Sequence, residues 1–369
     1  MDSGGEETGR LEGLYNASAL RKKLFITVTA ILIFLAAFIS LSLGAVDIPL
    51  GDIVRVFAHA LFPSAPGPTY DYYSNIVINA RLSRVILCLM CGFSLATAGA
   101  VMQNILRNPL VSPFTLGLSS AASFGAAMAI IFGAGITGSF MLMGHDFLVK
   151  NLFIASMAFV ASMASTLLVI FLSRRRDISR STIILTGVII SYLFQAGVSA
   201  AKYFSNDDAL REITLWLMGG MWNASWGVDF IVLTIVPLCA IAIEVYSMKV
   251  NILSAGDDVA LSLGINVQRL RTVMLVLCTL MTSVCIAFTG IIGFIGLIAP
   301  HVTRMFIGND SRYLFPASGL LGALILLVSD TAARMIIRPQ EIPVGIIMYI
   351  LGGLFFVWLV TRRKKEVTM

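Results

Sequence analysis

The chain is divided into apolar stretches that are long enough to cross a lipid bilayer. Its 369 residues are 58% hydrophobic and only 12% charged, whereas soluble domains carry about 45–50% apolar and about 25% charged residues. One soluble core of this size cannot bury that much apolar surface, so lipid is the expected solvent. Because a spanning helix takes roughly 20 apolar residues, the sequence predicts about ten spans and leaves no room for a sizeable soluble catalytic domain.

Ten apolar segments are the predicted spans, and they make the expected fold an all-α polytopic membrane protein. We expect a polar, disordered tail at 1–20, a single ten-helix domain at 21–365 and a short tail at 366–369. Between the spans, residues 46–62 are predicted to form a short amphipathic helix. The predicted spans are 24–45, 82–104, 115–136, 152–173, 181–203, 227–247, 270–289, 292–307, 313–333 and 342–361.

The basic residues predict an orientation. Eighteen of the 26 Lys and Arg residues fall on one side of the predicted spans and eight on the other. Because cytoplasmic loops carry the excess of Lys and Arg, we expect both termini to be cytoplasmic, in the cytoplasmic (inner) membrane. Five plus five spans also suggest two five-helix halves of inverted orientation, as in many transporters.

Motifs for catalysis and nucleotide binding are missing from the sequence. None of the three histidines lies in an H-E-x-x-H motif, and no G-x-x-x-x-G-K-[ST] motif occurs, so we expect no enzyme and no P-loop. The basic residues form small clusters rather than one face, which argues against nucleic-acid binding. Cys88 and Cys91 form a lone C-x-x-C inside an apolar run, which we interpret as helix packing, with no metal or cofactor.

Asp330 is the one carboxylate well inside an apolar run. An ionisable group within the membrane is a candidate functional site, so a secondary transporter coupled to protons or sodium is the alternative from another class. Arg334 follows four residues later, which is the spacing of a helical ion pair. A local ion pair is therefore the preferred interpretation.

The segment 254–266 is polar and has the signals of a separate short helix. Ser254 and Asp257 have the spacing of a capping box, and Asp257 and Asp258 would lie at the N-terminus, where the helix dipole favours acids. Gly264 is placed to end the helix in the left-handed conformation. The apolar side of this helix would need cover, so we expect it to dock a soluble cytoplasmic partner.

Four arginines, Arg81, Arg84, Arg334 and Arg338, lie at the outer ends of predicted spans. Snorkelling to the interface accounts for a single arginine. Four of them on the side where basic residues are scarce suit bidentate pairing with carboxylates of another protein.

Five glycines in or directly beside the predicted spans are expected to let helices approach closely, because lipid provides no hydrophobic drive for helix association. They are Gly92, Gly99, Gly290, Gly293 and Gly296.

Several motifs occur in order along the chain: RLSR (81–84), RNPLVSPFTLGLSSAASFG (107–125), GDDVALSLGIN (256–266), TGIIGFIGLIAPHVTR (289–304) and EIPVGIIMYILGGLFFVWL (341–359). With them, the chain resembles the FecCD family of ABC-transporter permeases over about residues 20–365. Members of that family are the membrane subunits of importers for ferric siderophores, haem and cobalamin.

The resemblance implies a homodimer of ten-helix subunits in the bilayer, with two ATP-binding subunits docked on the cytoplasmic side. ATP hydrolysis would then belong to those partners. The segment 254–265 would be the coupling helix that receives their motion, and its candidate residues are Asp257, Asp258, Leu261 and Gly264.

The resemblance also implies a substrate-binding protein on the outer side, whose acidic residues would meet Arg81, Arg84 and Arg334. Arg338 has no clear place in the family pattern. The path for the substrate would run along the dimer axis. Gln195 is a candidate for that path that no motif carries, and a hydrogen bond between packed helices explains it equally well.

The expected function is therefore that of a permease subunit that carries an iron chelate into the cytoplasm. Ferric siderophore is the default substrate, and haem and cobalamin are the alternatives within the same architecture. A membrane scaffold without transport activity is disfavoured, because ten spans with a coupling-type helix are more than a scaffold requires.

Overall fold

The computed structural model describes residues 3–44, 46–62, 72–142, 145–174 and 180–366. Apart from one short hairpin, its regular elements are helices. In chain order they are α1 (Ser3–Ser42), α2 (Leu50–Leu61), the π-helix η1 (Asn75–Leu82), α4 (Ser83–Leu106), the 3₁₀ helix η2 (Pro113–Leu116), α5 (Leu118–Phe132), β1 (Ser139–Leu142), β2 (His145–Leu148), α6 (Val149–Arg174), α7 (Arg180–Phe204), α8 (Asp207–Met218), α9 (Trp226–Val245), α10 (Ser247–Ala255), α11 (Asp257–Ser262), α12 (Val267–Thr289), α13 (Ile295–Ile307), α14 (Ser311–Met335) and α15 (Val344–Glu366).

Within the described residues, eight helices are long and apolar enough to cross a membrane. They are α1, the continuous segment Tyr72–Leu106 that includes α4, α6, α7, α9, α12, α14 and α15. Two further apolar helices, α5 and α13, are shorter. Each predicted apolar segment overlaps one of these helices, which confirms a polytopic helical membrane protein. The count of ten spans and the inverted halves stay predictions.

Two parts of the chain differ from the sequence-based expectation. Helix α1 begins at Ser3, so the disordered tail expected at 1–20 is wrong for residues 3–20, whose backbone continues the helix. Strands β1 and β2 pair antiparallel, with Ser139 opposite Leu148, so the fold is not purely helical. The two strands together have only eight residues, which is too short a stretch to be recognised in the sequence between two predicted spans.

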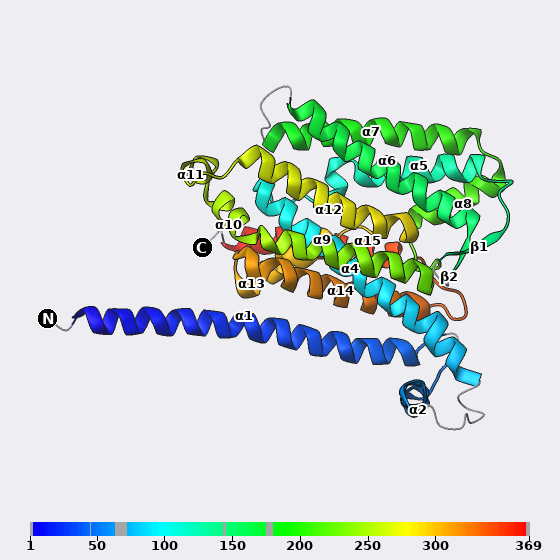
Figure 1. The fold of residues 1–369 in the computed structure, drawn as a ribbon, viewed down its shortest axis with the longest axis horizontal. Coiled ribbons are helices and arrows are strands. Elements are labelled where there is room, and N and C mark those ends of the chain that lie inside the picture. Colours follow the sequence, from blue (N-terminus) through cyan, green and yellow to red (C-terminus); the bar gives the residue numbers. More distant parts are fainter. Residues whose placement is uncertain (1–2, 45, 63–71, 143–144, 175–179, 367–369) are drawn as a thin grey trace.

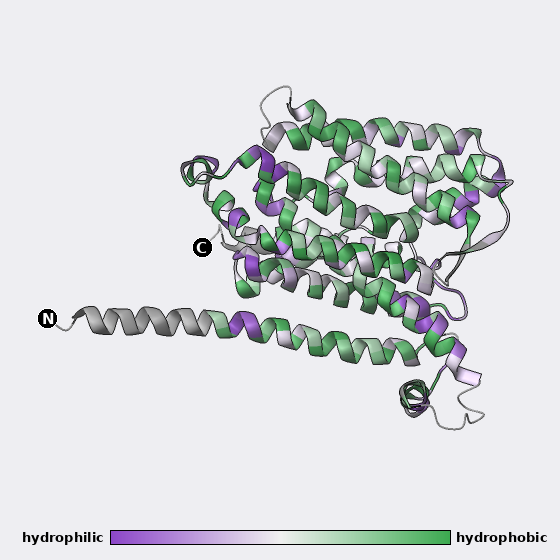
Figure 2. Ribbon diagram, in the orientation of Figure 1, coloured by the Kyte–Doolittle hydropathy of each residue, from purple (hydrophilic) through white to green (hydrophobic). Residues whose placement is uncertain are grey.

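The helices run roughly parallel to one another, and Figure 1 shows what gathers at each end of the bundle. The start of α1, the end of α15 and helix α11 lie at one end, which we call the α11 end. Helix α2 and the hairpin lie at the other, the α2 end. Figure 2 shows apolar residues along the lengths of the helices and hydrophilic residues gathered toward their ends, as expected of a protein that spans a bilayer.

Helix α4 is the centre of the packing. It contacts α14, α12, α13 and α9, and most of its residues are buried. By contrast, α1, α7 and α15 leave most of their apolar surface uncovered. The core therefore lies around α4, and these three helices form the periphery of the single subunit.

Glycines allow α4 to approach its neighbours closely, as predicted. A Cβ added to Gly99 would lie 2.0 Å from the carbonyl oxygen of Gly296 in α13, and one added to Gly92 would lie 2.4 Å from that of Gly322 in α14. Side chains at these positions would push the helices apart. The close contacts bring α13 and α14 against α4 and thereby align their ends.

Candidate functional site

The polar segment that precedes α12 forms two short helices rather than one. Gly256, with φ 162° and ψ 149°, separates α10 from α11. The Oγ of Ser254 donates to the carbonyl oxygen of Asn251 at 2.7 Å, and no side chain caps α11. The predicted capping box is wrong, because the extended backbone at Gly256 leaves Ser254 in the last turn of α10. The separate helix itself is confirmed.

Gly264 ends this segment in the predicted left-handed conformation, with φ +76°. Its backbone nitrogen donates to the carbonyl oxygen of Leu261 at 2.9 Å, and that of Ile265 donates to Ala260 at 2.9 Å. Such a turn satisfies carbonyl groups that a helix end leaves without partners. It also lets the chain reverse into α12, where the Asn266 side chain accepts from the backbone nitrogen of Arg269.

Asp257 is held by two arginines of the same chain. Its carboxylate oxygens accept from Arg271 Nη2 at 2.9 and 2.8 Å, and Arg107 Nη2 lies 3.2 Å from Oδ1. These contacts tie α11 to α12 and to the turn that follows α4. Of the two acids predicted at the helix start, Asp258 is exposed, so it is the one that can meet a partner.

Three large apolar side chains in α11 and at its C-cap are exposed. Val259, Leu261 and Leu263 are 44%, 59% and 62% exposed, while Ala260 is buried and anchors the helix. We call these three exposed residues the apolar tip. Figure 1 shows α11 projecting from the neighbouring helices at the α11 end, so the tip is available to another molecule.

Arg84 forms a network of ion pairs at the α2 end. Its guanidinium group donates to Asp330, with Nη2 2.9 Å from Oδ1, and its Nη1 lies 2.7 Å from Glu341 Oε2. Arg334 Nε lies 3.3 Å from Asp330 Oδ2, which confirms the predicted local pair. Asp330 is therefore shared by two arginines, and only one of them could be found from spacing along a helix.

Arg81 does not face the outside. Its guanidinium group is buried and donates to the carbonyl oxygens of Leu41 at 2.6 Å and Ser42 at 2.9 Å, and to that of Val46. The last carbonyl groups of a helix have no partners within it. Arg81 supplies donors to the end of α1, so its expected exposure at the outer surface is wrong.

Arg334 also donates hydrogen bonds to the end of α1. It is buried and donates from Nη2 to Ser40 Oγ at 2.6 Å and from Nη1 to the carbonyl oxygen of Leu43 at 3.2 Å. The expected exposure of Arg334 is therefore wrong as well. Arg338 remains partly exposed and lies 3.0 Å from Asp47. Docking of a binding protein by the arginines stays a prediction, for which Arg84 and Arg338 have the better access.

Gln195 lies on the exposed face of α7. Its neighbours Tyr192 and Leu193 are 74% and 69% exposed. Among the described residues, its side chain has no hydrogen-bond partner, so the packing hydrogen bond considered from the sequence is not formed within this subunit. The pathway role of Gln195 stays a prediction.

No group of three or more His, Cys, Asp or Glu side chains that could hold a metal ion occurs among the residues that the structure describes. The five cysteines are buried and free.

Comparison with known proteins gives a consistent result. A family model described as the FecCD transport family matches residues 31–362. The chain is 37% identical to MJ0087 of Methanocaldococcus jannaschii, named an ABC transporter permease protein, over 96% of this chain and 98% of that one. It is 35% identical to the hemin transport system permease protein HmuU of Yersinia pestis, over 81% of this chain and 86% of that one.

A solved structure of a metal-chelate type ABC transporter in an inward-facing conformation has a similar fold. Its TM-score is 0.78 at 28% identity, and the match covers 91% of this chain and 98% of that one. Other relatives are named for the import of Fe(3+)-citrate, iron(3+)-hydroxamate and vitamin B12.

Proposed function

The chain belongs to the FecCD transport family, and from this premise we propose that it is the membrane-spanning permease subunit of an ABC importer for an iron chelate. The observation that carries the proposal is the apolar tip of α11, exposed at one end of a bundle whose sequence has no nucleotide-binding motif. A transporter built this way needs a separate ATPase, and the tip gives that ATPase a place to dock.

The contacts of α11 explain how docking would reach the spans. Asp257 joins α11 to α12 through Arg271 and to the end of α4 through Arg107. A displacement of the tip is therefore transmitted to the two most buried of the long apolar helices. Asp258 and the apolar tip provide the surface for the ATPase, while Asp257 provides the rigid connection.

We propose a homodimer in which ten helices of each subunit cross the cytoplasmic membrane, with both termini cytoplasmic. The start of α1 and the end of α15 lie at the same end as α11 (Figure 1), and basic residues predominate on that side. The uncovered face of α7, including Gln195, supports a contact with the second subunit or with the substrate path.

On the opposite side we propose that a substrate-binding protein docks. Arg84 is the best placed of the three predicted arginines, because part of its surface is open and Glu341, one of its partners, is itself partly exposed. Arg81 and Arg334 would contribute indirectly, by holding the end of α1 against the bundle.

Ferric siderophore is the proposed substrate, with haem or cobalamin as the alternative. Relatives named for hemin, iron(3+)-hydroxamate and vitamin B12 support this range. An ion-coupled secondary transporter that uses Asp330 is disfavoured, because that acid is paired with both Arg84 and Arg334.

Transport in reconstituted vesicles tests the proposal. The permease, its ATPase and its binding protein would be placed in proteoliposomes, and uptake of a radioiron-labelled ferric siderophore would be measured with ATP, without ATP and with an ionophore. We expect uptake that requires ATP and survives the ionophore. Uptake that persists without ATP and collapses when the ion gradient is dissipated would refute the importer.

A further inference from the structure

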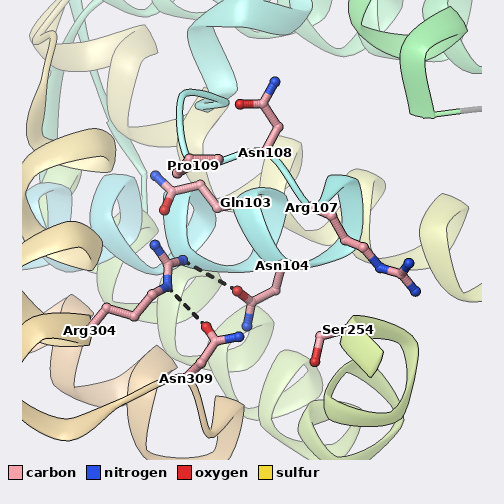
Figure 3. A pocket seen from close by; sticks show the side chains of 8 residues that line it. All are labelled: Gln103, Asn104, Arg107, Asn108, Pro109, Ser254, Arg304 and Asn309. Atoms are coloured by element: carbon pink, nitrogen blue, oxygen red, sulfur yellow. Dashed lines mark hydrogen bonds between the residues drawn. The ribbon is translucent and has the colours of Figure 1, made fainter. Parts of the chain in front are cut away.

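A polar cavity of about 290 Å³ lies at the α11 end, between the ends of α4, α10 and α13. Its lining consists largely of side-chain amides, a hydroxyl group and two guanidinium groups, and it contains no carboxylate. Figure 3 shows these side chains around the cavity. The lining includes Gln103, Asn104, Arg107, Arg304 and Asn309.

Arg304 is a cation without an anionic partner among the described residues. Its Nε donates to Asn309 Oδ1 at 3.0 Å, and its Nη2 donates to Asn104 Oδ1 at 3.3 Å. Both acceptors are neutral amides. The carbonyl groups at the end of α13 offer partial negative charge, but the lining of the cavity contains no full anion.

The amides around Arg304 are fixed in orientation. Asn104 Nδ2 donates to Ser311 Oγ at 3.0 Å, which directs its Oδ1 toward Arg304. Gln103 Nε2 donates to the carbonyl oxygen of Gly296 at 3.1 Å. The positions of donors and acceptors in the cavity are therefore set before any ligand arrives.

Gln103 belongs to the enclosed part of the lining. It is 3% exposed, and its Oε1 is buried among protein atoms, so that oxygen does not contact a ligand in the cavity. The charged group that a ligand meets is therefore the guanidinium group of Arg304. A ligand for this cavity offers acceptor oxygens to Arg304.

We propose that this cavity binds a phosphate group. A phosphate group carries the negative charge that Arg304 lacks among its partners, and arginine is well suited to phosphate oxygens. Arg107 adds positive charge at the cavity wall, although part of that charge is used by Asp257 at 3.2 Å. The phosphate could belong to a free anion or to a phospholipid headgroup, since the chemistry is the same. The proposal does not rest on the function proposed above.

Titration of the full-length protein in detergent tests the proposal with two probes, inorganic phosphate and dihexanoyl phosphatidylglycerol. Isothermal titration calorimetry is expected to show saturable binding of at least one probe. Asn309→Asp should weaken that binding about tenfold, because it places a carboxylate next to Arg304 Nε. Asn309 is exposed, so this variant is expected to fold. Arg304→Gln should weaken binding similarly, and Arg304→Lys less.

Arg269→Gln is the matched control, because Arg269 is an exposed arginine at the start of α12 and does not line this cavity. Binding of inorganic phosphate supports a soluble anion, and binding of only the lipid supports a headgroup. The proposal is overturned if neither probe binds saturably, if Asn309→Asp binds as the unmodified protein does, or if Arg269→Gln weakens binding as much as Asn309→Asp.

Discussion

Arg84 Nη2 lies 2.9 Å from Asp330 Oδ1, although the two residues are 246 positions apart in the chain. The pair joins α4, the central helix, to α14, the helix that it contacts most extensively. Only 14% of the Arg84 side chain and 1% of the Asp330 side chain are exposed. Because the pair is buried, loss of one partner would leave the other charge uncompensated.

Asp330→Asn is therefore expected to destabilise the protein. Removing one partner of a buried ion pair costs about 3–5 kcal/mol, and here two arginines lose their acid. The unfolding temperature can be measured with a thiol-reactive dye, because the cysteines are buried until the protein unfolds. Asp52→Asn, which removes a pair with an exposed arginine, should change the unfolding temperature little. An equal loss in both variants would contradict the structural role of Asp330.

Docking of a binding protein makes a different prediction for Arg84. In Arg84→Gln protein that remains folded, we expect weaker affinity for the binding protein at low salt, because a charge at the docking surface is lost. The measurement is surface plasmon resonance with the permease in nanodiscs, with Arg55→Gln as the exposed control. Unchanged affinity would argue against docking by Arg84 and would leave its structural role intact.

Gly99→Ala should loosen the contact between α4 and α13. The new Cβ would lie 2.0 Å from the Gly296 carbonyl oxygen, so the backbones must separate, at a cost of about 1–3 kcal/mol. Gly353→Ala, in α15, is the matched control, since nothing lies within 4 Å of its added Cβ. The unfolding temperature should fall only in the first variant, and a fall of equal size in both would exclude this explanation.

Leu261→Asp is expected to abolish co-purification of the ATPase subunit while leaving the permease folded. Leu261 is exposed, so a charge there costs the single subunit little but prevents burial in an apolar interface. Gln268→Asp, at an exposed position of α12 outside the apolar tip, should retain the ATPase. Co-purification of Leu261→Asp at the unmodified level would show that the tip is not the docking surface.

The stability of the folded protein should depend on pH through Asp310. Side-chain hydrogen bonds from Arg312, and then from Asn251, hold the pKa of Asp310 below its usual range. A depressed pKa in the folded state means that the carboxylate stabilises the protein above the unfolded pKa of about 3.9, and that this contribution is lost as the pH falls through the folded pKa.

We therefore expect Asp310→Asn to lower the unfolding temperature by similar amounts at pH 7 and pH 5, and by less at pH 3. Asp258→Asn, at an exposed acid, serves as the comparison. A deficit for Asp310→Asn that grows toward pH 3 would have the wrong sign for this mechanism.

The spans were predictable because each is determined by a local property, the length of an apolar run. The same holds for the turn at Gly264 and for the pair of Asp330 and Arg334, which are four residues apart. Arg84 was predicted to pair with carboxylates of another protein, but it pairs with Asp330 of the same chain. Its partner comes from α14, and only the packing of α4 on α14 brings the two together.

The errors in the candidate site have the same origin. Arg81 and Arg334 were expected at the surface, but the end of α1 needs donors, and that need is invisible in the sequence around either arginine. The capping box failed because Gly256 adopts an extended conformation, a choice that Asp257 reinforces by pairing with Arg271 in α12. Contacts between residues far apart in the sequence thus determined the positions of Arg81, Arg334 and Asp257.

The two arginines that donate to the end of α1, Arg81 and Arg334, are synthesised at different times after that helix. Arg81 is 40 positions from Leu41, whereas Arg334 is 294 positions from Ser40. At about 5–20 residues per second, the ribosome makes Arg81 within seconds of α1, but Arg334 follows roughly 15–60 seconds later. The end of a newly inserted α1 can therefore accept hydrogen bonds from Arg81 early in synthesis. Those from Arg334 become possible only after most of the chain has been translated.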